Sequence, residues 1–159
     1  MTSQSHLKNR AEALIDALAS EFGIRHTAAN GEINMTIDHI HLEIKSRANL
    51  MVLYTSIHQV PAEDILDIYK KLLSLSWNKN TYFQEGISID KASDSLYLSK
   101  KIETQSLSNH DFLLSVEDFL NTCEYFSKEC SKFVPSQEKS HYRSDNPYSK
   151  PHHSMHKEA

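Results

Sequence analysis

One short stretch, residues 38–43, carries side chains that could bind a metal ion. If this stretch is a β-strand, alternate residues point to the same face, which places His39, His41 and Glu43 together. Two imidazoles and a carboxylate are ligands of zinc and of redox metals. The solvated outer face of an amphipathic strand has the same pattern, and the sequence offers no fourth ligand. We therefore expect no metal and no other cofactor, and keep a metal-binding protein that uses His39 and His41 as the less favoured alternative.

Other residues with reactive or ligating side chains are few. His152, His153 and His156 lie in a stretch where weak metal binding is more often incidental than functional. Cys123 and Cys130 are seven residues apart in a predicted helix. The helix rises roughly 10 Å over that distance, which is too far for a disulfide. We interpret both cysteines as small buried side chains in a reducing compartment.

Motifs of catalysis and of nucleotide binding are absent from the sequence. It contains no G-x-G-x-x-G, P-loop, G-x-S-x-G, H-E-x-x-H or C-x-x-C pattern. With three glycines in the whole chain, the backbone has little means of approaching a phosphate closely. We expect a protein without enzymatic activity.

Composition and charge favour one globular domain that neither binds nucleic acid nor inserts into a membrane. The chain has 159 residues, of which 39% are hydrophobic and 24% charged, with a formal net charge of -4. This length buries a core without disulfides or metal. Lysines alternate with acidic residues, so the basic stripe needed for nucleic acid is missing. The N-terminus lacks the apolar segment of a signal peptide, and the longest apolar run, 50–54, is too short to cross a bilayer. We expect a soluble cytoplasmic protein.

Hydrophobic periodicity predicts eight elements in the order α-β-β-β-α-β-β-α. Helical spacing covers 3–22 and ends at Gly23, which is suited to a helix C-terminus. The strand at 50–57 is apolar on both faces, so its second face needs a cover that another molecule would supply. We predict an α+β fold with a mostly antiparallel, twisted sheet flanked by helices. The remaining elements are strands at 33–37, 40–44, 87–89 and 96–98, a helix at 61–77, and a long helix capped by Ser108 or Asn109.

The periodic pattern ends near residue 133. Three of the four prolines and four of the ten histidines lie beyond it, and apolar residues there are sparse. Such a segment cannot bury enough surface to offset its ordering entropy. We predict a folded domain over 1–133 and a disordered tail over 134–159.

Several local sequences resemble the class I type III secretion chaperones, the Tir-chaperone family, over most of residues 7–133. The family's typical helix end and polar loop resemble Leu72-Leu73 followed by Asn78 and Asn80. Its strand hairpin resembles residues 86–90 and 95–99, and its last helix resembles the stretch with Phe119-Leu120. The loop before residue 86 lacks the glycines common in the family, and the tail has no counterpart in the minimal family domain.

The resemblance implies a homodimer without ATPase or other enzymatic activity. Its partners would be one or more type III secreted effectors, with the secretion-apparatus ATPase as a further candidate. The protein would bind the effector's N-terminal segment in the bacterial cytoplasm and keep it soluble and competent for secretion. A regulatory or adaptor domain of the same fold, binding a folded partner, is the alternative.

An extended client can add to a sheet edge while its side chains enter apolar pockets. We therefore expect the contacts to be apolar residues beyond those that the protein's own core needs. For every one of them the competing interpretation is packing in the core. The predicted effector contacts are Leu7, Leu14, Leu18, Met35 and Ile37. The predicted dimer contacts are Leu53, Ile65, Tyr69, Leu72 and Trp77.

Overall fold

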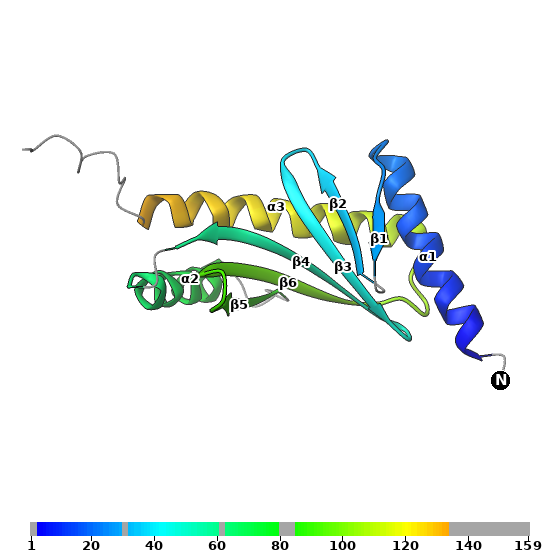
Figure 1. The fold of residues 1–159 in the computed structure, drawn as a ribbon, viewed down its shortest axis with the longest axis horizontal. Coiled ribbons are helices and arrows are strands. Elements are labelled where there is room, and N and C mark those ends of the chain that lie inside the picture. Colours follow the sequence, from blue (N-terminus) through cyan, green and yellow to red (C-terminus); the bar gives the residue numbers. More distant parts are fainter. Residues whose placement is uncertain (1–2, 30–31, 61–62, 80–84, 134–159) are drawn as a thin grey trace, which may run out of the picture.

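The computed structural model describes residues 3–29, 32–60, 63–79 and 85–133 (Figure 1). The predicted tail, residues 134–159, lies outside the described residues. No helix in the described part is long and apolar enough to span a membrane. The elements follow the predicted order with one additional strand. They are α1 (Ser3–Glu21), β1 (Thr27–Ala29), β2 (Glu32–Ile37), β3 (Ile40–Arg47), β4 (Leu50–Gln59), α2 (Ile65–Lys79), β5 (Gly86–Asp90), β6 (Ser95–Glu103) and α3 (Asn109–Phe133).

The strands form one six-stranded sheet in the order β1-β2-β3-β4-β6-β5, and every neighbouring pair is antiparallel. The two longest strands, β4 and β6, pair with each other, with one register shift between Ser56 and His58. The predicted α+β class and antiparallel sheet are confirmed. Strand β1 was not predicted, because three residues are too few to show an alternating pattern.

Helix α3 lies along the sheet and organises the core. It contacts β4, α1 and α2, and Figure 1 shows α1 near one end of α3 and α2 near the other. Its aromatic side chains Phe112, Phe119 and Phe126 recur every seven residues and are fully buried. They share one core with Met51 and Leu53 of β4. The regular spacing keeps these three rings on one face of the helix.

Strand β4 has the two apolar faces that its sequence predicted. Met51 and Leu53 are fully buried in the core. On the other face Leu50, Val52 and Tyr54 are only partly buried, and the Lys45 Nζ atom lies 5.5 Å from the centroid of the Tyr54 ring. A cover for this second face by another molecule stays a prediction.

The end of α1 has the geometry that Gly23 predicted. Gly23 adopts a φ of 62°, its N–H donates to the Ser20 carbonyl at 3.3 Å, and the Ile24 N–H donates to the Ala19 carbonyl at 3.0 Å. These two bonds form a Schellman motif. The motif turns the chain sharply after Phe22 and holds that side chain at the corner.

Ser108 is the N-cap of α3, one of the two residues predicted for that role. Its Oγ accepts a hydrogen bond from the Asp111 N–H at 3.0 Å and donates to the Asp111 carboxylate at 2.6 Å. We expect Ser108→Ala to lower the free energy of unfolding by about 1 kcal/mol, because the helix loses a partner for one free N–H group. Urea denaturation measures this change. The exposed Ser106→Ala is the control, and equal stability of the two variants would contradict the capping role.

Candidate functional site

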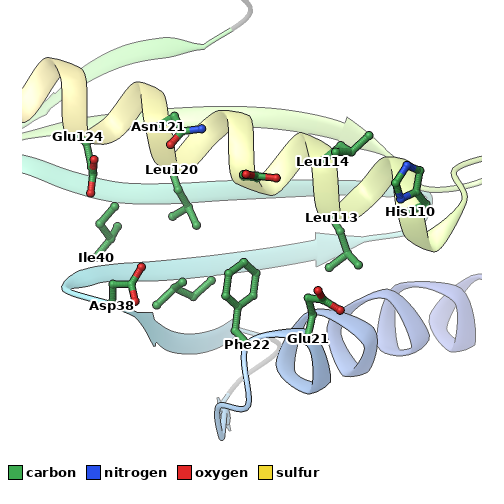
Figure 2. A pocket seen from close by; sticks show the side chains of 12 residues that line it. Glu21, Phe22, Asp38, Ile40, His110, Leu113, Leu114, Leu120, Asn121 and Glu124 are labelled. Atoms are coloured by element: carbon green, nitrogen blue, oxygen red, sulfur yellow. The ribbon is translucent and has the colours of Figure 1, made fainter.

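A groove lies between the end of α1, the β2–β3 turn and the first half of α3 (Figure 2). Its volume of about 490 Å³ falls within the range of pockets that bind ligands. Half of the lining is apolar and comes from three segments that are far apart in the sequence. The apolar lining residues are Phe22, Ile37, Ile40, Leu113, Leu114 and Leu120.

Local geometry explains why these side chains meet. The Schellman motif presents Phe22, which is exposed. A two-residue turn, Asp38-His39, joins β2 to β3 and sets Ile37 opposite Ile40. Asp38 has a φ of 54° in this turn, a conformation that aspartate tolerates better than most residues. Along α3, Leu113 and Leu120 are seven residues apart and therefore share one side of the helix.

The rim of the groove is acidic. Four carboxylates line it, from Glu21, Asp38, Glu117 and Glu124, and none of the lining residues is lysine or arginine. The carbonyl end of α1 adds partial negative charge beside Glu21. In Figure 2, Glu21 and Glu124 lie toward opposite ends of the groove. We call this site, with its apolar lining residues and four carboxylates, the acidic groove.

His39 does not lie on the strand face where alternation would place it beside His41 and Glu43. His39 lies in the turn and not in β3, and its Nε2 is 3.6 Å from Glu124 Oε1 of α3. His41 and Glu43 are inside β3, paired with Thr36 and Asn34 of β2. Alternation does not extend through a tight turn, so the three side chains do not share one face. Among the residues that the structure describes, no three His, Cys, Asp or Glu side chains are grouped to hold a metal ion.

Both cysteines are free and buried in α3, as we interpreted them from the sequence. Burial raises the pKa of the Cys123 thiol to about 12, and the nearby Glu85 carboxylate adds to this effect. Burial likewise raises the pKa of Cys130, to about 11. Both thiols therefore stay protonated at neutral pH. Because the thiolate is the nucleophilic form, neither cysteine is a reactive nucleophile there.

The predicted effector contacts lie mainly in the core. Leu14, Leu18, Met35 and Ile37 are buried, and Ile37 is the one that also lines the acidic groove. The side chain of Leu7 lies outside the described part of the structure. A contact of these residues with an effector stays a prediction that a single chain does not test. Sequence reasoning missed Leu114, although an apolar residue off the buried stripe of α3 is a recognisable signal of a second surface.

The predicted dimer contacts divide between the core and the surface. Leu53 and Leu72 are fully buried. Ile65 and Tyr69 are partly buried against the core, and the Tyr69 hydroxyl donates to the Ile87 carbonyl at 3.3 Å. Trp77 is 86% exposed. Trp77 is therefore the predicted contact most accessible to a second molecule.

Helix α2 exposes an apolar stripe that includes Trp77. Leu66 is 65% and Leu73 is 45% exposed. The intervals of seven and four residues place Leu66, Leu73 and Trp77 on one face of the helix. We call these three residues the α2 stripe.

A buried cation lies on the sheet under α3. The Lys100 Nζ atom of β6 is 3.2 Å from Asp118 Oδ2 and 3.7 Å from Glu85 Oε1, and it donates to the Ser115 carbonyl at 3.4 Å. The Glu85 side chain is 5% exposed, whereas that of Asp118 is 72% exposed. Lys100 thus connects β6 with α3 and with Glu85, the residue before β5.

Residues 13–127 match the profile of the Tir chaperone protein (CesT) family. The chain belongs to this family. The resemblance found in the sequence is thereby confirmed. A search of the curated proteins found no significant match to this CesT-family chain.

Solved structures share the fold of this CesT-family chain. A chain of the HopA1-SchA chaperone-effector complex superposes with a TM-score of 0.58 at 18% identity, covering 74% of this chain and 93% of that one. A chain of the ExoU-SpcU complex from the type III secretion system of Pseudomonas aeruginosa superposes with a TM-score of 0.57 at 11% identity, covering 76% of this chain and 97% of that one. YbjN, a candidate transcription regulator from E. coli, superposes with a TM-score of 0.60 at 11% identity, covering 78% of this chain and 96% of that one. At these identities the likeness shows the fold.

Proposed function

We propose that this protein is a non-catalytic chaperone of type III secretion in the bacterial cytoplasm. It binds the N-terminal segment of one or more secreted effectors and keeps that segment soluble and competent for secretion. The observation that carries this proposal is the CesT-family match over residues 13–127. The fold shared with chains of the HopA1-SchA and ExoU-SpcU complexes supports it.

The surfaces of the described chain suit a client that is not folded. A segment that orders on binding loses conformational entropy, so it needs a large contact area with several apolar anchor points. The acidic groove and the α2 stripe lie near different ends of α3 and provide separate apolar surfaces (Figure 1). One surface can then hold the client while the other joins two subunits.

We further propose that the protein is a homodimer joined through the α2 stripe. Leu66, Leu73 and Trp77 are large apolar side chains that the rest of the described chain leaves uncovered. A two-fold axis beside α2 would pack each stripe against its copy. The secretion-apparatus ATPase stays a further candidate partner.

Affinity capture of the tagged protein from its own bacterium, grown while secretion is active, tests the proposed function. Mass spectrometry should recover one or a few secreted effectors. The isolated N-terminal segment of a recovered effector should then bind the purified protein by calorimetry. A variant truncated after Phe133 should recover the same effectors, if residues 1–133 form the domain and 134–159 are dispensable for binding.

The alternative is a regulatory or adaptor domain that binds a folded partner, and the likeness to YbjN is the observation that favours it. In that case the capture would recover folded cytosolic proteins. Their N-terminal segments alone would fail to bind. That result would remove the chaperone proposal while leaving the family membership intact.

A further inference from the structure

The acidic groove combines two properties that together specify a ligand. Its lining includes the exposed apolar side chains of Phe22 and Leu114. Its rim holds four carboxylates and no lysine or arginine. An apolar surface alone binds any hydrophobic segment. A negatively charged rim favours clients with positive charge and repels clients with negative charge.

The carboxylates are placed on both walls of the groove. Glu117 and Glu124 stand on α3 seven residues apart, so the backbone positions that carry them are separated by roughly 10 Å along the helix. Glu21 at the end of α1 and Asp38 in the β2–β3 turn belong to the facing segments, as Figure 2 shows. A side chain bound in the groove is thus flanked by negative charge along the groove and across it.

The basic groups near this rim leave it acidic. Of the groups that the structure describes there, His39 is 3.6 Å from Glu124, and His110 lines the end of the groove. None of the residues that line the groove is lysine or arginine, so histidine is the only residue type beside the four carboxylates that can carry positive charge.

We propose that the acidic groove binds the part of the client in which an apolar side chain is flanked by lysine or arginine residues. The basic residues would be about 10 Å apart, which is seven residues in a helical segment or three to four in an extended one. This inference rests on the proposed chaperone function. A uniformly apolar client could bind the acidic groove in several registers. The flanking basic residues would select which apolar residue of the client occupies the groove.

Two short fluorescent peptides test the rule with the full-length protein. One has a central Leu-Phe pair flanked by lysines, and the other has glutamate in place of every lysine. Fluorescence anisotropy should show the basic peptide binding at least about tenfold more tightly at low salt. Raising the salt from about 0.05 M to about 0.5 M should remove most of this preference, because exposed charges are screened.

Substitutions locate the binding. Glu117→Gln with Glu124→Gln should weaken the basic peptide about five- to tenfold and flatten its salt dependence. Leu114→Ser, at an exposed position, should weaken both peptides. The matched control is Glu63→Gln with Asp67→Asn, which removes two exposed charges beside or on α2 and should change neither affinity. Circular dichroism verifies that each variant is folded.

Equal affinity of the two peptides, or no effect of the Glu117 and Glu124 substitutions, would overturn the inference. A groove variant with an altered oligomeric mass would also overturn it, because the groove would then be a contact between copies. The captured effector separates this inference from the function that it assumes. If its N-terminal segment binds the wild type and the Gln variant equally, the groove rule fails and the chaperone proposal stands.

Discussion

Replacing Lys100 with alanine is expected to lower the free energy of unfolding by about 3–5 kcal/mol, the usual cost of removing one partner of a buried ion pair. The cost arises mainly at Glu85, whose side chain is 5% exposed and would lose its contact with the Lys100 ammonium group. Asp118 is 72% exposed and can return to water. The Ser115 carbonyl also loses a donor. Urea denaturation followed by circular dichroism measures the change.

Two further variants separate charge from packing. Lys100→Met keeps most of the side-chain volume, so its loss of stability reports the lost polar contacts of the ammonium group with Glu85, Asp118 and the Ser115 carbonyl without a cavity. Combining Lys100→Met with Glu85→Gln should recover a large part of that loss, because a neutral amide is easier to bury than a carboxylate. If Lys100→Met is as stable as the wild type, the Lys100–Glu85 pair contributes nothing measurable.

Introducing charge into the α2 stripe is expected to convert a dimer into a monomer. In a two-fold dimer each substitution acts twice, so Leu73→Glu with Trp77→Glu should weaken association by at least about 100-fold. Light scattering across micromolar concentrations measures the mass. The monomeric variant should remain folded, because both side chains are exposed in the single chain.

The control for the α2 stripe is Lys128→Glu, an exposed position on α3 that should leave the mass unchanged. Trp77 provides a second measurement, since it is the only tryptophan in the chain. Its emission should shift to longer wavelength when the wild-type protein is diluted and the ring enters water. A wild-type protein that is monomeric at all these concentrations would remove the dimer proposal.

Most of the fold followed from hydrophobic periodicity because each long element keeps one pattern over its length. The seven-residue recurrence of Phe112, Phe119 and Phe126 in α3 and the alternation of Met35 and Ile37 in β2 are examples. Strand β1 has three residues and no pattern to detect. Lys100 occupies a buried position between Leu98 and Ile102 of β6. Alternation indicates that position, but the partners Glu85 and Asp118 come from other elements and have no signature in β6.

The candidate surfaces were harder to predict than the fold, since they depend on which apolar residues the core leaves uncovered. Helix α2 carries one stripe with Ile68 and Leu72 toward the core and a second with Leu73 and Trp77 toward the surface. The sequence pattern of apolar residues in this helix does not separate the core-facing stripe from the exposed one. The acidic groove is formed where α1, the β2–β3 turn and α3 converge. Residues 21 and 124, at its two ends, are brought together only by the tertiary fold.

The separation of the acidic groove from the α2 stripe along α3 determines how many clients a pair of subunits can hold. Helix α3 has 25 residues and is therefore roughly 37 Å long. A pair joined through α2 keeps each groove near the α1 end of its subunit, away from the shared contact (Figure 1). A client long enough to reach both grooves makes its second contact as an intramolecular step, which raises avidity by about 10²–10⁴-fold. A shorter client would instead bind as two independent copies.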